Sequence, residues 1–144
     1  MTEPVEVRVT RRFAHPRERV FEAFVDPDRA GEWLFRTEGG VMERTDYDPT
    51  PGGEFAIFER RGGDLARHFG RFVTVEPPRL VAFDFWVDAN PPVRVTVGFQ
   101  PDGDGCLVTL SHDLSAAWVE YRERSEHGWS AILAALDRTM ETAP

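Results

Sequence analysis

The sequence contains no lysine and only one cysteine, Cys106, among its 144 residues. A single cysteine excludes an internal disulfide and fits a reducing compartment. No apolar run approaches the roughly 20 residues that a membrane-spanning helix needs. Residues 1–13 alternate in polarity and contain no apolar signal segment. We therefore expect a cytoplasmic protein with no membrane span.

Positive charge is also scarce. The chain carries 17 arginines against 25 acidic residues, which gives a net charge of −8. The arginines are scattered, and the only adjacent pairs are at 11–12 and 60–61. Without a basic stripe or a polybasic patch, neither nucleic acid nor an anionic membrane surface is an expected partner.

The usual signatures of catalysis and metal binding are missing. The glycine pairs match neither a dinucleotide-binding fingerprint nor a P-loop, and there is no G-x-S-x-G elbow. No two histidines have a metal-ligand spacing, and "DGDG" at 102–105 lacks the later glycine and acid of a calcium loop. We predict no metal and no cofactor, and the sequence assigns no catalytic residue.

Hydrophobic residues make up 41% of the chain, enough for a real core in one domain spanning residues 1–144. Residues 5–13 alternate as a strand, and two short helices follow, over 15–26 and from Asp26 to near Gly31. Six further strands are predicted near 41–46, 53–60, 66–76, 79–87, 93–100 and 106–114. The last segment, 116–143, has the apolar spacing of a long helix.

Short turns between the six strands require antiparallel neighbours. The sequence thus predicts an α+β fold in which one curved antiparallel sheet wraps around one long C-terminal helix. Within residues 66–76 both faces carry a phenylalanine, Phe69 and Phe72. We expect a β-bulge that turns both of them toward the core.

Five segments in this order resemble the START/Bet v 1-like (SRPBCC) superfamily. They are "FAHPRERVFEAFVDPDRAGEW" (13–33), "PGGEF" (51–55), "GRFVTVEPPRLVAFDF" (70–85), "LVTLSHDL" (107–114) and "GWSAILAAL" (128–136). More narrowly, the chain is similar to the polyketide-cyclase-like branch named for the activator of Hsp90 ATPase. The resemblance implies a helix-grip fold with a cavity for an apolar ligand between sheet and helix.

The inward phases of the strands and helix point to the same interior. Eleven residues are expected to surround one cavity: Trp33, Phe55, Ile57, Phe83, Phe85, Val95, Val97, Leu110, His112, Trp129 and Leu133. Together with Arg122 they are the twelve expected ligand-binding residues. The competing interpretation is an ordinary filled core. Gly128, before Trp129, either lets the helix approach the sheet closely or leaves space beside it.

Among the titratable residues, His112 is expected to face inward, either as a polar group of the pocket or as a satisfied core histidine. Arg122 and Ser125 share the helix face of Trp129, and either meet a polar head group at the pocket mouth or are solvated. His15, His68 and His127 are expected at the surface or at element ends.

Three functions are open on these grounds. The first is binding of a small apolar or aromatic molecule. The second is a cyclase or aromatase acting on a polyketide-like chain, with His112 as the proton-transfer group that can be named. The third is a chaperone-regulating module. We rank it last, because the chain has no room for the additional N-terminal domain that the family's Hsp90 activators carry.

Overall fold

The computed structural model of the protein describes residues 4–37, 39–88 and 90–142. The strands are β1 (Val5–Phe13), β2 (Val41–Tyr47), β3 (Glu54–Arg61), β4 (Asp64–Glu76), β5 (Leu80–Val87), β6 (Val93–Asp102) and β7 (Gly105–Leu114). The helices are α1 (Arg17–Phe24), α2 (Ala30–Trp33), the 3₁₀ helix η1 (Ala116–Tyr121) and α3 (Arg122–Thr142). The order of elements is the predicted one.

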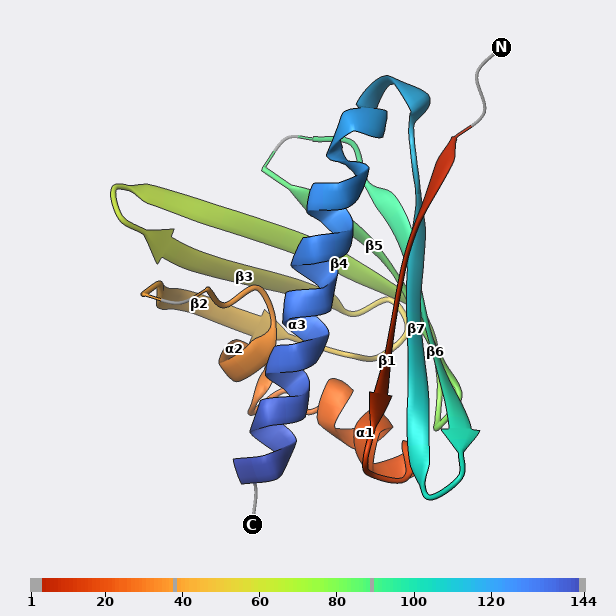
Figure 1. The fold of residues 1–144 in the computed structure, drawn as a ribbon. Coiled ribbons are helices and arrows are strands. Elements are labelled where there is room, and N and C mark those ends of the chain that lie inside the picture. Colours follow the sequence, from red (N-terminus) through yellow and green to blue (C-terminus); the bar gives the residue numbers. More distant parts are fainter. Residues whose placement is uncertain (1–3, 38, 89, 143–144) are drawn as a thin grey trace.

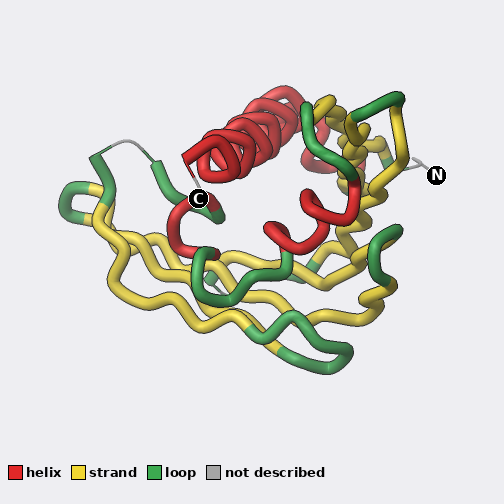
Figure 2. The backbone as a smooth tube through the Cα atoms, turned by 90° about the horizontal axis from the view of Figure 1, so that it is seen from below, coloured by secondary structure: helices red, strands yellow, loops and turns green. Residues whose placement is uncertain are grey.

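The seven strands form one antiparallel sheet in the order β1-β7-β6-β5-β4-β3-β2. From β2 to β7 each strand pairs with the next, as short hairpin connections require. The first strand closes the other edge by pairing with β7, Val7 opposite His112. The sheet curves, and α3 crosses its concave side with α1 and α2 beside it (Figures 1 and 2). This is the predicted α+β helix-grip fold.

The predicted bulge is present in β4, where the pairing with β5 shifts between Phe72 and Thr74. Before the shift, even-numbered residues face the core, and Phe72 is 1% exposed. After it Val75 packs against the core instead. The prediction for Phe69 is wrong: it lies on the outer face, with Phe58 and Trp86. The extra residue changes the phase of the strand only beyond Phe72.

The second short helix begins later than predicted, at Ala30, and Gly31 lies inside it. The Asp26 carboxylate accepts a hydrogen bond from the backbone N–H of Asp28 at 3.0 Å. This bond within the Asp26–Asp28 segment closes a turn and is not a helix cap, because a short acidic side chain competes locally for backbone donors.

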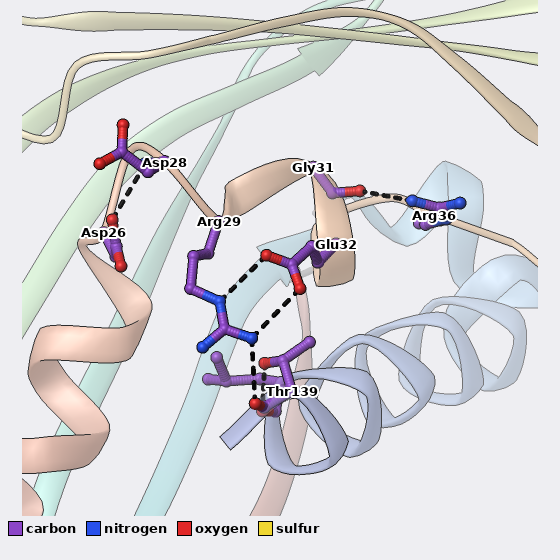
Figure 3. Close-up of polar contacts among 8 residues, drawn as sticks. Asp26, Asp28, Arg29, Gly31, Glu32, Arg36 and Thr139 are labelled. Atoms are coloured by element: carbon purple, nitrogen blue, oxygen red, sulfur yellow. Dashed lines mark hydrogen bonds and ion pairs between the residues drawn. The ribbon is translucent and has the colours of Figure 1, made fainter. Parts of the chain in front are cut away.

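An arginine ties α2 to the C-terminal half of α3 (Figure 3). The Arg29 guanidinium pairs with Glu32 at 3.0 Å and donates to the Thr139 carbonyl oxygen at 3.2 Å. The chain after α2 then reaches both layers, since the Phe35 ring contacts Trp129 of α3 and Phe85 of β5.

The long helix is confirmed, but it begins at Arg122 and not at residue 116, where the sequence predicted its start. Residues 116–121 form η1, in which Trp118 has non-helical angles (φ −112°, ψ 17°) and is 52% exposed. Trp118 therefore does not face the core, although residues 116–143 were predicted to form one continuous helix with an apolar face. Farther along α3, Trp129 and Leu136 are 6% and 0% exposed, as expected for residues on the concave face of the sheet.

Candidate functional site

A cavity of about 1110 Å³ lies between the N-terminal half of α3 and the sheet. It is bounded by η1, the ends of β5 and β7, the segment 90–93 and the chain following α2. Six of its lining residues are aromatic: Phe35, Phe85, Trp86, Trp118, Tyr121 and Trp129, of which Trp86 has its ring stacked on Phe69 at the outer face. Aliphatic and proline side chains complete an apolar wall, from Val87, Pro91, Pro92, Val93, Leu114 and Ile132.

Three of the twelve predicted ligand-binding residues line this cavity: Phe85, His112 and Trp129. The prediction that eleven of them, all except Arg122, surround one cavity is wrong. Eight are at most 3% exposed and belong to the packed core, namely Trp33, Phe55, Ile57, Phe83, Val95, Val97, Leu110 and Leu133. Their rings and branched side chains fill the space under α3, as the Phe55–Phe83 contact at 5.7 Å illustrates. Of these, Trp33 also borders a separate cavity of about 170 Å³.

Arg122 also lies outside the cavity wall. Its side chain is 51% exposed and pairs with Glu126, one helical turn later, at 3.7 Å. Ser125 does line the cavity, as expected, and so does Arg124. Helical phase gives the direction in which Arg122 leaves the backbone, but its long side chain bends to the nearest carboxylate.

Gly128 lines the cavity, and a Cβ added there would meet no atom within 4 Å. The close-approach explanation for this glycine is therefore wrong, and the alternative, that it leaves space, is the observed one. The neighbouring Trp129 closes the inner end of that space against Phe85, with ring centres 5.4 Å apart.

His112 faces inward, as predicted, and both of its ring nitrogens are engaged. Its Nδ1 lies 3.0 Å from the carbonyl oxygen of Asp113, and its Nε2 accepts a hydrogen bond from the Trp129 indole at 3.0 Å. An indole can only donate, so the ring carries its proton on Nδ1. His112 thus fixes the position of Trp129 and has no lone pair left for a ligand.

His68, expected at the surface, lines the cavity and is 7% exposed. Its ring stacks on Phe35 at 4.2 Å, and Nδ1 lies 3.3 Å from the carbonyl oxygen of Ile57. A carbonyl accepts, so Nδ1 holds the proton and Nε2 bears a lone pair. No hydrogen bond within the described residues engages Nε2. Burial lowers the pKa of His68 to about 4, so the imidazole is neutral at pH 7.

The strand pattern of the sequence could have indicated that His68 faces the interior. It stands four residues before Phe72 in the same strand, so an inward Phe72 places His68 on the same face. Phe35 gave no comparable signal. It is 6% exposed and adopts a positive φ of 55°, which a non-glycine residue rarely does. Its backbone oxygen accepts a hydrogen bond from Arg61 at 3.4 Å, and its ring lies 5.0 Å from Phe85.

A buried carboxylate stands behind this part of the wall. Glu59 is fully buried and accepts hydrogen bonds from the Thr37 backbone N–H at 2.6 Å, the Thr37 hydroxyl at 2.9 Å and Arg61 at 2.5 Å. Burial by itself raises the pKa of Glu59, but the Arg61 and Thr37 bonds outweigh it and lower that pKa. The carboxylate is therefore charged at pH 7 and holds Thr37 and Arg61 at the cavity edge.

No three His, Cys, Asp or Glu residues of the described chain are grouped so that they could hold a metal ion. Cys106, at the start of β7, is fully buried, and burial raises the pKa of its thiol. In the same part of the chain, no helix is long and apolar enough to span a membrane.

Known proteins of similar structure share this fold. A protein from Rhodobacter sphaeroides superposes with a TM-score of 0.83 at 20% identity, covering 96% of this chain and 93% of its own. Protein CV1439 from Chromobacterium violaceum gives 0.80 at 23% identity, covering 93% and 95%. DynU16, described as a putative protein in the dynemicin biosynthetic locus, gives 0.76 at 21% identity, covering 95% of this chain and 47% of its own.

The search among curated proteins finds no match for this chain. A family does match: residues 14–141 fit the family described as activator of Hsp90 ATPase homolog 1-like protein. That range begins just after β1 and ends in the last turn of α3, so it includes strands β2 to β7 and the cavity-lining helix. The chain therefore belongs to the activator of Hsp90 ATPase homolog 1-like family.

Proposed function

We propose that the protein binds a small apolar or aromatic molecule in the cavity between α3 and the sheet. The observation that carries this proposal is the cavity itself, about 1110 Å³ with six aromatic residues on its wall. Ligand sites in proteins are typically concave, mostly apolar and roughly 300–1,000 Å³ in volume. Burial in such a site yields roughly 25 cal/mol for each Å² of apolar ligand surface removed from water.

Few polar atoms are available to orient the ligand. Inside the cavity the Nε2 lone pair of His68 can accept one hydrogen bond, and Ser125 offers a hydroxyl on the helix side. His112 contributes indirectly, because it fixes Trp129. In this arrangement shape and burial supply affinity, and one or two hydrogen bonds select the orientation.

An enzymatic role, such as that of a polyketide cyclase or aromatase, has less support. It needs a positioned group whose pKa is close to the working pH. Both His112 nitrogens are engaged, and a pKa of about 4 makes His68 a weak base at pH 7. The neighbour from the dynemicin locus matches at only 21% identity, so its setting does not carry over to this chain's chemistry.

A chaperone-regulating role has less support still, since a protein-docking surface is expected to expose a large continuous apolar patch. The exposed large apolar residues of the described chain lie on three elements: Val41 on β2, Val73 on β4, and Trp118 with Val119 on η1. The η1 pair borders the cavity through Trp118, which suits ligand entry as well as a partner.

Binding of phenylnaphthylamine, a neutral dye that fluoresces in apolar surroundings, tests the proposal. We expect saturable binding of one dye per protein. Gly128→Trp places an indole in the cavity and should abolish binding, whereas Ser130→Trp adds the same group at an exposed position of α3 that does not line the cavity. Native mass spectrometry of the purified protein should reveal co-purified small molecules. Absence of dye binding, or equal binding by both variants, would refute the proposal.

A further inference from the structure

The charged residues that the structure places around the cavity have one sign. Three arginines line it, Arg36, Arg61 and Arg124, and none of the described lining residues is an aspartate or glutamate. This contrasts with the whole chain, which carries 25 acidic residues against 17 arginines. A cleft lined by one sign of charge concentrates ions of the opposite sign, because its low-dielectric walls focus the field.

The three arginines differ in how far their charge is compensated. Arg61 donates to the buried Glu59 carboxylate, so that pair is internally neutral. Arg36 and Arg124 have no carboxylate within 4 Å among the described residues. By contrast, eleven arginines of the described chain do form such ion pairs.

Among the described residues, the two cavity-lining arginines without an ion pair, Arg36 and Arg124, each make one weak contact. Arg36 donates to the Gly31 carbonyl oxygen at 3.4 Å (Figure 3), and the acid in the same helix, Glu32, is bound by Arg29. Arg124 lies over the Tyr121 ring at 5.6 Å, while the nearby Glu126 pairs with Arg122. Both side chains are exposed at the cavity rim and retain free N–H donors for a ligand.

We propose that the ligand is an amphipathic carboxylate, with an apolar, ring-containing body and one anionic group. The body packs against Phe85, Trp129 and Ile132, and the carboxylate lies at the rim within reach of Arg36 or Arg124. Guanidinium groups bind carboxylates with two parallel hydrogen bonds, which suits them to this task. This inference rests on the proposed function, because it names the chemical class that the same cavity selects.

Displacement of bound phenylnaphthylamine by three matched compounds tests this inference. Naphthoate, naphthalenemethanol and naphthylmethylamine share one ring system and differ in charge. We expect naphthoate to bind roughly tenfold more tightly than the alcohol at pH 7, as a charge-assisted hydrogen bond predicts, and the amine to bind most weakly. Added salt should reduce the preference for naphthoate, because the rim is exposed.

Arg36→Gln and Arg124→Gln should each weaken naphthoate binding, by about threefold if each supplies an exposed charge contact, and leave the alcohol unchanged. Arg138→Gln is the control: it removes an equally exposed arginine of α3 that also lacks an ion pair in the described structure and does not line the cavity. Equal affinity for acid and alcohol, or an equal loss in Arg138→Gln, would overturn the inference. The proposed function would still stand in either case, since it depends on binding of the neutral dye itself.

Discussion

At the scale of single residues, the two inward histidines, His112 and His68, differ in how many of their ring nitrogens have a hydrogen-bond partner. The Nδ1 of His112 donates to the Asp113 carbonyl oxygen, and its Nε2 accepts from the Trp129 indole. His68 stacks on Phe35, with the nearly parallel Phe85 ring 6.2 Å away, and its Nε2 lone pair has no partner within the described residues. His112 thus holds a neighbouring side chain in place, whereas His68 is the residue that we propose accepts a hydrogen bond from the ligand.

The burial of His68 makes the stability of the protein depend on pH. The folded pKa is about 4 and the ordinary value is about 6.5, so between these values the unfolded chain binds a proton that the folded chain excludes. The free energy of unfolding should therefore fall by roughly 2–4 kcal/mol as the pH drops from 6.5 to 4.

Urea unfolding at a series of pH values measures this loss. His68→Phe keeps the stacking and removes the titrating group, so its unfolding free energy should vary less over the same range. In NMR titrations the His68 ring signals should stay unchanged down to about pH 5. A His68 that titrates near its ordinary value would contradict the prediction.

Glu59 gives a second acid-sensitive contribution, at lower pH. Its folded pKa is lowered, so its stabilisation is complete above the unfolded value of about 4.3 and is lost as the pH falls through the folded value. Glu59→Gln keeps the shape but removes the charge, and should cost about 1–3 kcal/mol at pH 7 because Arg61 loses its partner. The unfolding free energy of Glu59→Gln should lack the loss that protonation of Glu59 causes below about pH 4.3. An unchanged melting temperature of Glu59→Gln at pH 7 would contradict this prediction.

At the scale of elements, two glycines in regular structure have opposite roles. Gly128 lies within α3 beside open space, whereas a Cβ at Gly70 in β4 would lie 2.0 Å from the Phe55 ring. Neither has the positive φ that would itself call for glycine. Their roles follow from what lies opposite them, which is the cavity in one case and the packed core in the other.

Gly128→Ala should therefore stabilise the protein by about 0.5–1 kcal/mol, the ordinary gain of alanine over glycine inside a helix. Gly70→Ala should destabilise it by roughly 1–3 kcal/mol, because the Phe55 ring must move in a filled core. Thermal or urea unfolding of the two variants beside the natural protein measures both. A destabilised Gly128→Ala would mean that α3 approaches the sheet more closely than described.

At the scale of the whole molecule, the space between sheet and helix is divided into a packed half and an open half. One half is filled by core side chains, among them Phe55, Phe72, Phe83 and Leu133, all at most 3% exposed. The other half, around the first turns of α3, is the large cavity. Phe83 and Phe85 share one strand and one face and fall on either side of this division.

Their alanine variants should reveal the division. Phe83→Ala leaves a void in a filled core and should cost about 3–5 kcal/mol, whereas Phe85→Ala enlarges an existing cavity and should cost clearly less. Phe85→Ala should also change the affinity for phenylnaphthylamine, and Phe83→Ala in its folded state should not. Equal costs in urea unfolding, with no dye binding by the natural protein, would favour a filled core throughout.

The sequence by itself determined the order of elements, the sheet they form and the direction of most side chains. Alternation in "VEVRVTRRF" and the spacing of Trp129, Leu133 and Leu136 are local properties of a strand and a helix, so they can be counted along the chain. The bulge in β4 was predicted from the same counting and is present, but the premise that it buries both phenylalanines was wrong, since Phe69 lies on the outer face.

Only the tertiary structure decided where the interior is open and which polar groups reach it. Inward direction is the same for Phe83 and Phe85, and only the local distance between helix and sheet separates core from cavity wall. Glu59 is stabilised by Thr37 and Arg61, and Thr37 comes from a distant part of the chain. Arg122 and Arg124 are two residues apart, and the carboxylate of Glu126 holds only the first. Which side chains pair depends on residues that folding brings together, and the periodicity of the sequence contains no information on such distant partners.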